Sequence, residues 1–272
     1  MFRKLSMPSK WSVLFLVAIT LCALFAPWVA PYSYEVQDTG HVLAAPDGTH
    51  WMGTDRLGRD LFSRLVYGAR VSLFIGVFTT LVAVVIGTVY GAISGYAGRK
   101  TDSVMMRIVD VVFALPDLLM IILIMVALGR GLWGIFLALS LVSWVTVARV
   151  VRGEVLRVKE FTYIEAARAI GAGHARIVFH EILPNIWGVL IVTLTFRIPV
   201  AILAESTLSF IGLGIAPPFS SWGTLANDGW TAIKFYPHLI LFPSLAIFLT
   251  ILSFNFLGEG LRDLLDPQKA YK

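Results

Sequence analysis

The sequence predicts an all-α integral membrane protein with six transmembrane helices. Of its 272 residues, 57% are hydrophobic and 14% are charged, against about 25% charged residues in an ordinary soluble domain. The mean hydropathy is +0.80, and long apolar runs alternate with polar stretches too short for a second folded domain. These three observations argue against a soluble globular protein.

Six apolar runs account for the predicted spans, because about 20 helical residues cross a hydrocarbon core of about 30 Å. We expect the first run to be an uncleaved span, since it is longer than the roughly 7–15-residue core of a signal peptide; a cleaved signal peptide is the alternative. The third run is interrupted by Asp110, Pro116 and Asp117. In chain order the runs are 11–30, 71–98, 108–129, 131–148, 186–211 and 239–258.

The polar segment 31–70 contains a pattern typical of an amphipathic helix. Leu57, Leu61 and Leu65 recur every four residues, and polar residues fill the opposite side of such a helix. We therefore expect an external helix that lies in the membrane interface before the second span. The polar side comprises Arg56, Arg59, Asp60, Ser63, Tyr67 and Arg70.

Two glycine patterns predict packing and turns. Gly87, Gly91 and Gly95 recur every four residues in the second span, so one face of that helix can approach a neighbour closely. Residues 129–134 spell GxGxxG, but no strand precedes them. We therefore expect a tight turn between the third and fourth spans rather than a nucleotide site.

The motifs of common enzyme sites are missing. The sequence has neither a GxxxxGK[ST] phosphate loop nor a GxSxG nucleophile elbow. His180-Glu181 begins like an HExxH zinc motif, but the fifth position is Pro184. Cys22 is the single cysteine, which excludes an internal disulfide. We expect no enzymatic activity, metal site or cofactor on this chain, so the energy for uphill transport would come from another subunit or an ion gradient.

An even number of spans puts both termini on one side of the membrane, and the positive charges identify that side. Fifteen Lys and Arg residues fall on the side of the termini, six fall on the other side and Arg197 lies within a span. This asymmetry favours cytoplasmic termini. The first group is Arg3, Lys4, Lys10, Arg99, Lys100, Arg107, Arg149, Arg152, Arg157, Lys159, Arg168, Arg176, Arg262, Lys269 and Lys272; the second is Arg56, Arg59, Arg64, Arg70, Arg130 and Lys234.

The charge-rich segment 159–185 lies between two spans on the side of the termini. Thr162 can cap a short helix there, with Glu165 three residues later to complete a capping box. Gly171 and Gly173 can end that helix with positive φ angles.

A second helical run over 175–183 is expected to stop at Pro184, which cannot continue a helix smoothly. The segment would then be two short helices held between rigid turns. Such a shape is suited to binding by another protein.

This segment resembles the EAA loop of ATP-binding-cassette (ABC) importer permeases, through Glu165-Ala166-Ala167, Gly171 and Leu183-Pro184. Glu181 departs from the pattern, which has an apolar residue at that place. In that family the loop docks in a groove of a cytoplasmic ATPase and transmits its movements to the membrane helices. A helix cap is the alternative role for Glu165, and the two roles are compatible. The resemblance assigns ATPase coupling to Tyr163, Glu165, Ala166, Ala167, Gly171, Leu183 and Pro184.

Two further runs resemble the dipeptide, oligopeptide and nickel branch of that family. They are GTDxxGRDxxSRxxYGAR over 53–70 and AESTLSFIGLG over 204–214. The chain thus looks like a C-type membrane subunit with the type I ABC importer permease fold and a cytoplasmic coupling helix. The implied domains are an N-terminal helix with the external interfacial helix, the permease domain and a cytoplasmic tail, over 1–70, 71–262 and 263–272.

The resemblance also implies partners and a location. It implies a second homologous permease, two ABC ATPases that carry ATP and Mg²⁺, and an extracytoplasmic substrate-binding protein, all at the bacterial inner membrane. Nucleic acid is not expected as a partner. Uptake of dipeptides or oligopeptides is the implied function, while nickel complexes and glutathione are further cargoes of the family, and the sequence leaves the choice open.

Ionisable residues within spans point to a pathway or to contacts between subunits, because a charge that faces lipid costs several kcal/mol. The candidates are Asp117, Arg197 and Glu205, while Asp110 lies near a span end and can snorkel. Arg197 and Glu205 are eight residues apart, or about 12 Å along a helix, so each needs its own partner. For Glu205, a subunit contact and a pore-lining role both stay open. A relay of these charges in an ion-coupled secondary transporter is the alternative function, and a membrane-embedded enzyme is a third.

Overall fold

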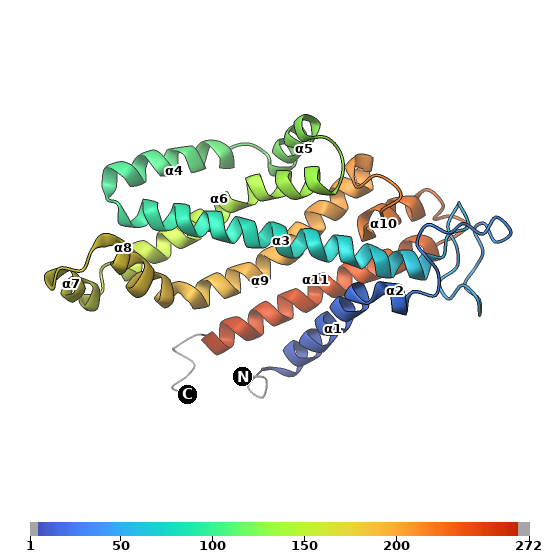
Figure 1. Cartoon of the computed structure of the whole chain (residues 1–272), viewed down its shortest axis with the longest axis horizontal. Coiled ribbons are helices and arrows are strands. Elements are labelled where there is room, and N and C mark those ends of the chain that lie inside the picture. Colours follow the sequence, from blue (N-terminus) through green and yellow to red (C-terminus); the bar gives the residue numbers. More distant parts are fainter. Residues whose placement is uncertain (1–4, 266–272) are drawn as a thin grey trace.

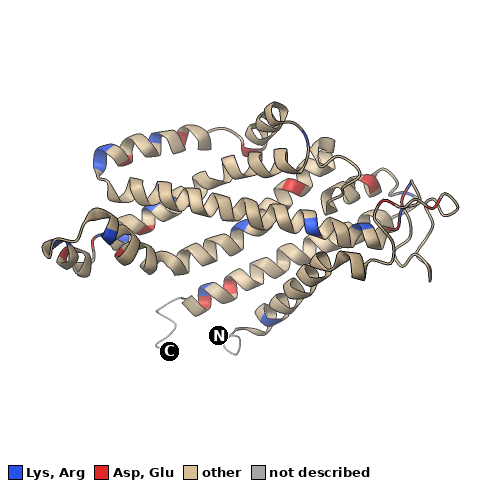
Figure 2. Cartoon of the chain, in the orientation of Figure 1, with Lys and Arg blue, Asp and Glu red and all other residues tan. Residues whose placement is uncertain are grey.

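The computed structural model describes residues 5–265, and this part of the chain is helical, without a β-strand. The long helices run roughly side by side along the molecule, and most charged residues lie toward its two ends (Figures 1 and 2). In chain order the elements are α1 (Met7–Leu24), α2 (Ala26–Val29), α3 (Leu61–Tyr96), α4 (Arg99–Phe113), α5 (Asp117–Leu128), α6 (Leu132–Val158), α7 (Thr162–Ala169), α8 (His174–Arg176), the π-helix η2 (Ile177–Ile182), α9 (Leu183–Leu208), the π-helix η3 (Ser209–Leu213), α10 (Trp222–Trp230) and α11 (His238–Leu265).

Five helices of the described chain are long and apolar enough to cross a membrane, and a sixth span results if the bent pair α4 and α5 counts as one. The break in this pair is a bend of 86°. Pro116 is the N-cap of α5, and a proline both lacks an N–H and disfavours the helical conformation of the residue before it. The predicted third span is therefore two helices.

The central contact of the molecule is between α3 and α6. The repeated glycines of α3 lie at this contact. A Cβ atom added at Gly91 would lie 2.5 Å from the carbonyl oxygen of Ala148, and one at Gly87 would lie 2.6 Å from Val147 Cβ. Only glycine lets the two backbones come this close. The predicted close approach is confirmed, and its partner is α6.

The segment around the first turns of α3 differs from the predicted interfacial helix. α3 begins at Leu61 and continues without a break into the second span, so no separate helix forms. The predicted polar face is also partly turned inward, since Asp60 and Ser63 are buried, whereas Arg56 and Arg70 are exposed. Asp60 of this face bonds Nδ1 of His50 and accepts the N–H of Ser63, and these groups replace the water that the amphipathic pattern assumed. Buried Arg64, which lies outside the predicted face, bonds the carboxylates of Asp55 and Asp228.

Pro184 does not end a helix, contrary to the sequence-based expectation. The chain passes from α8 through η2 into α9, and Pro184 occupies the first turn of α9. The N–H of Leu183 donates to the carbonyl of Val178, five residues back. The helical path therefore continues past Pro184 without a break. The proline lies in the first turn of α9, where a residue needs no N–H partner within the helix.

The first span belongs to the bundle. Ser9 of α1 donates its hydroxyl hydrogen to the carbonyl of Phe256 in α11 at 2.8 Å. Both the start of α1 and the end of α11 lie toward the end of the molecule that carries α7 (Figure 1). Most of the predicted tail 263–272 lies outside the described residues, and its first residues are the last of α11.

We expect Gly91→Leu to destabilise the protein by about 1–3 kcal/mol, because the new side chain meets the backbone of α6. Thermal unfolding in lipid nanodiscs measures this loss. Gly153→Ala is the control, since an added Cβ at this α6 position meets nothing within 4 Å. Equal melting temperatures for Gly91→Leu and the unsubstituted protein would contradict the close packing of α3 on α6.

Candidate functional site

The candidate site is the segment from α7 to η2, which projects beyond the long helices at one end of the molecule (Figure 1). α7 has eight residues, fewer than the roughly 12–15 that an isolated helix needs for stability in water. The surrounding structure must therefore hold it in place.

The N-terminal end of α7 is not capped as predicted. Phe161 is the N-cap, with extended backbone angles, and no side chain caps the helix. Thr162 is already the first helical residue, so the capping box with Glu165 is wrong. Glu165 is exposed in the first turn, where a carboxylate is favoured by the helix dipole. Its side chain is free to face another molecule.

The C-terminal end of α7 is fixed by its own backbone. Gly171 has φ +84°, and its N–H donates to Arg168 O while the N–H of Ala172 donates to Ala167 O, both at 3.0 Å. These two bonds form a Schellman motif, in which the left-handed residue is normally glycine. The prediction for Gly171 is confirmed. The prediction for Gly173 is wrong, because this residue has φ −68° and starts α8.

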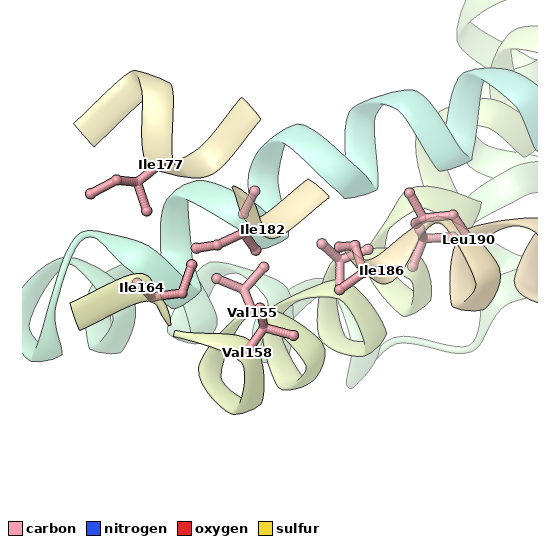
Figure 3. Packing of buried hydrophobic residues seen from close by; sticks show 10 residues of the cluster. Val155, Val158, Ile164, Ile177, Ile182, Ile186 and Leu190 are labelled. Atoms are coloured by element: carbon pink, nitrogen blue, oxygen red, sulfur yellow. The ribbon is translucent and has the colours of Figure 1, made fainter. Parts of the chain in front are cut away.

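A buried aliphatic cluster joins α7 to two membrane helices. Ile164 of α7 is fully buried and packs with residues of α6, η2 and α9 (Figure 3). Half-buried Ala167 and Leu183 pack against the same cluster. We call this group the base cluster; it comprises Val155, Val158, Ile164, Ile177, Ile182, Ile186 and Leu190.

The C-terminal end of α3 supports the segment from the other side. Tyr96 shares a hydrogen bond of 3.1 Å with Nδ1 of His174, and its ring lies 5.6 Å from the guanidinium carbon of Arg168. Lys159 donates to the carbonyl of Gly95 at 3.0 Å. α7 and α8 therefore rest on α3 as well as on α6 and α9.

The outer face of α7 is apolar. Tyr163, Ala166 and Ile170 recur at spacings of three and four residues, which places them on one side of the helix, and Ile170 is 84% exposed. Burial, and secondarily the charge of Glu181, raises the pKa of Tyr163, so its ring stays neutral at pH 7. This outer face is an unpartnered apolar surface on a rigid support.

The seven predicted coupling residues separate into two groups. Exposed Glu165, Ala166 and Pro184 and partly exposed Tyr163 are accessible, as is Gly171, whereas Ala167 and Leu183 support the base cluster. The sequence reading missed Ile170, Phe161 and Phe179, all exposed apolar residues of this segment. Ile170 lies about 240° around the helix from the inward-facing Ile164, so helical periodicity alone could have found it.

Glu205 is fully buried within this chain. Ser209 of η3 donates to one carboxylate oxygen at 2.7 Å, and Ser72 of α3 donates to the other at 3.5 Å. Ser72 in turn accepts the N–H of Trp222 at 3.1 Å. The carboxylate thus connects α9, η3 and α3, and through Ser72 the start of α10.

The other charges within spans bond to different groups, and Arg197 also interacts electrostatically with Asp117. Arg197 donates to the carbonyl of Ser143 in α6 at 3.2 Å, so Arg197 and Glu205 have independent partners, as their spacing predicted. Asp110 forms an ion pair with Arg149 at 2.6 Å. Asp117 is exposed at the start of α5. An exposed charge in a span has to face water or a neighbouring chain.

Two family models match the chain. Residues 83–271 match the model "Binding-protein-dependent transport system inner membrane component", and residues 9–46 match "N-terminal TM domain of oligopeptide transport permease C". The first match covers more than half of the sequence. It includes α7, the base cluster, Arg197 and Glu205.

Curated relatives align over nearly the whole chain. The dipeptide transport system permease protein DppC of Bacillus subtilis is 46% identical over 98% of this chain and 82% of its own length. The oligopeptide transport system permease protein OppC of the same organism is 44% identical over 94% of this chain and 84% of its own length. The glutathione transport system permease protein GsiD of Pectobacterium atrosepticum is 42% identical over 94% of this chain and 85% of its own length.

Solved structures share the fold. A structure of the MetNI methionine ABC transporter in an inward-facing conformation matches with a TM-score of 0.64 and 20% identity, over 76% of this chain and 98% of the matched chain. A structure of an amino acid ABC transporter with histidines matches with a TM-score of 0.56 and 18% identity, over 75% and 93% of the two chains. The helical architecture of this chain is therefore that of ABC importer permeases.

We expect Gly171→Ala to loosen the end of α7, because a left-handed backbone costs an L-residue about 1–2 kcal/mol. Amide hydrogen exchange of residues 171 and 172 should then accelerate by roughly tenfold. Gly173→Ala is a matched control: both glycines have open space around an added Cβ, and only Gly171 has a positive φ. Equal effects of the two substitutions would contradict the Schellman motif.

We expect Glu205→Leu to destabilise the protein by about 1–3 kcal/mol, because the buried hydroxyls of Ser209 and Ser72 lose their acceptor. Glu205→Gln retains an acceptor oxygen and should cost less. Unfolding in nanodiscs measures both. Thr207→Ala is the control, since the hydroxyl of this half-buried residue donates to the carbonyl of Leu203 within its own helix and not to Glu205. A Leu variant as stable as the Gln variant would show that the carboxylate does not hold these elements together.

Proposed function

Because the chain belongs to the family of inner membrane components of binding-protein-dependent transport systems, we propose that it imports short peptides together with a second permease. In this proposal an ATPase drives transport by binding α7. It is a multi-pass membrane permease of the ABC importer class and not itself an enzyme. Importers of this class are in general driven by ATPases and receive their substrate from binding proteins. In the proposed assembly ATP and Mg²⁺ are bound by two separate ATPase subunits, and no cofactor is needed on this chain.

Short peptides are the proposed cargo because of the names of the relatives. Those permeases are named for oligopeptides, dipeptides and glutathione, at 42–46% identity over most of this chain. Glutathione is itself a small peptide, so the shared chemistry is a short chain of amide bonds with charged ends. Mass spectrometry of ligands that co-purify with the intact assembly identifies the cargo.

The proposed orientation places α7 and both termini in the cytoplasm and the segment 31–60 outside, in the inner membrane of a bacterium. The excess of Lys and Arg on the side of the termini supports it. The shape of the chain agrees, because α7 lies at the end of the bundle where α1 starts and α11 ends (Figure 1). A cytoplasmic ATPase could then reach α7.

The observation that carries the coupling proposal is the pairing of an exposed apolar face on α7 with the base cluster beneath it. Tyr163, Ala166 and Ile170 would enter a groove of the ATPase, and Ile164 would transmit the resulting force. The base cluster includes the C-terminal turns of α6 and the first turns of α9. A displacement of α7 therefore moves the ends of two membrane helices at once.

A second permease is proposed as the neighbour that completes the pathway. Asp117 is exposed in this chain and needs water or another protein around it. Many large apolar side chains on α4 and α5, such as Val104, Leu119 and Val126, are also exposed. Such a face suits lipid on one side and a homologous helix bundle on the other. Asp117 and Arg197 remain candidates for the pathway or the subunit contact.

The charges within the described spans offer less support to an ion-coupled relay. Asp110, Arg197 and Glu205 bond to different groups, and none bonds to another of the three. Among the four charges of such a relay, Arg197 and Asp117 interact electrostatically. Within the described part of the chain, however, no hydrogen bond links these two to Asp110 or Glu205. A proton relay needs neighbouring groups that exchange hydrogen bonds. A relay would also leave the exposed face of α7 without a role.

We expect Ile170→Asp and Ala166→Arg to abolish co-purification of the ATPase subunits, because each places a charge in an apolar contact. Both positions are exposed, so membrane insertion and the melting temperature should stay unchanged. Gly153→Asp, at an exposed position of α6 with open space around it, is the control. If the ATPases stay bound to both α7 variants, the coupling role of α7 is wrong.

A further inference from the structure

The irregular segment 31–60 gathers three metal-binding side chains at the end of the molecule opposite α7 (Figure 1). Asp38, His41 and His50 each offer one ligand atom, and these atoms lie within 4.8 Å of one another. We propose that they form a site for a divalent transition-metal ion of the zinc, nickel and copper group. This site is independent of the cargo and of α7.

The donor set selects the class of ion. Two imidazoles and one carboxylate suit zinc, nickel and copper, whereas calcium and magnesium prefer oxygen ligands alone. Three protein ligands leave a fourth position open for water or for a donor from another molecule. The sequence motifs for zinc sites do not contain this arrangement, because the three residues are not in a standard spacing.

His50 is already held as a metal ligand would be. It is 5% exposed, and its Nδ1 bonds a carboxylate oxygen of Asp60 at 3.0 Å. A carboxylate on one imidazole nitrogen fixes the ring and makes the other nitrogen a better ligand. With Nδ1 bound to Asp60, Nε2 is the nitrogen left for an ion.

The turn that carries the other two ligands is also fixed in place. The N–H of Asp38 donates to the carbonyl of Gly58 at 3.1 Å, and the N–H of His41 donates back to the carbonyl of Asp38 at 3.1 Å. The carbonyl of His41 accepts the hydroxyl of Thr54. Gly58 has φ +71°, and an added Cβ would lie 2.0 Å from the carbonyl oxygen of Asp38. The turn with Asp38 and His41 is therefore packed against the segment that leads through Gly58 to Asp60.

Small side-chain movements close the site. A tetrahedral ion with ligands at about 2.0–2.1 Å brings neighbouring ligand atoms to about 3.3 Å. Asp38 and His41 can make this movement, because their side chains are 46% and 55% exposed. Their mutual hydrogen bond of 2.8 Å would be exchanged for bonds to the ion.

A bound ion would act on the beginning of α3. Asp60 is the N-cap of α3 and accepts the N–H of Ser63 at 2.7 Å, while its other oxygen bonds His50. An ion on His50 thus links the turn at Asp38 to the capped end of a membrane helix. In the proposed orientation this link lies outside the cytoplasm, where it can respond to extracytoplasmic metal.

The test titrates the transporter assembly containing the full-length chain, in lipid nanodiscs, with Co²⁺ followed by visible absorption and with Zn²⁺ followed by calorimetry. We expect His41→Ala and Asp38→Asn to weaken binding at this site by at least about tenfold and to remove its cobalt absorption. His180→Ala, which replaces an exposed histidine of η2, is the matched control and should bind as the unsubstituted protein does.

His41→Cys gives a positive readout. A thiolate at this position should keep the ion and shift the cobalt spectrum toward sulfur ligation, which a structural role of His41 would not produce. Binding that is the same in the unsubstituted protein, His41→Ala and Asp38→Asn would overturn the proposal. So would the absence of binding in the unsubstituted protein. Because both replaced side chains are exposed, unchanged melting temperatures without metal verify that the variants fold.

Discussion

The burial of Ile164 in the base cluster is the interaction on which the rest of the proposed mechanism depends. α7 is too short to be stable on its own, so its shape comes from Ile164 inside the cluster and from the backbone bonds around Gly171. The same cluster contains the ends of α6 and α9. The contact that gives α7 a definite surface is therefore also the contact that connects it to the membrane helices. A partner that displaces α7 cannot do so without displacing both helices.

Features set by neighbouring residues could be predicted from the sequence, and features set by distant contacts could not. The left-handed Gly171 and the close glycine face of α3 follow from local chemistry, and both are present. The start of α7 was misplaced by one residue. Its register is set by the side chain that enters the base cluster, and Ile164 rather than a capping threonine decides it. The passage through Pro184 likewise depends on a π-helical turn, which local propensity does not reveal.

The charged residues at the end of the molecule opposite α7 also depend on contacts that are distant in the sequence. The amphipathic pattern of 57–70 predicted polar residues in water, but their partners come from other parts of the chain. Asp60, on the predicted polar face, pairs with a histidine of the preceding segment. The nearby Arg64, outside that face, bonds Asp228, which lies 164 residues later. The proposed metal ligands were missed for a related reason: motif searches look for fixed spacings, whereas these side chains meet because the turn at Asp38 rests on Gly58.

The helices differ in how they can transmit a movement of α7. α3 has 36 residues, or about 54 Å of length, contains no proline, and is locked to α6 along Gly87, Gly91 and Gly95. These two helices should move as one rigid body. α9 is different, because Pro199 lies within it and a π-helix stands at each end. Single π-turns and internal prolines are the places where helices bend. A displacement of α7 would therefore tilt α3 and α6 together and bend α9. Glu205 lies where the rigid and the bending parts meet, because its carboxylate bonds η3 through Ser209 and α3 through Ser72.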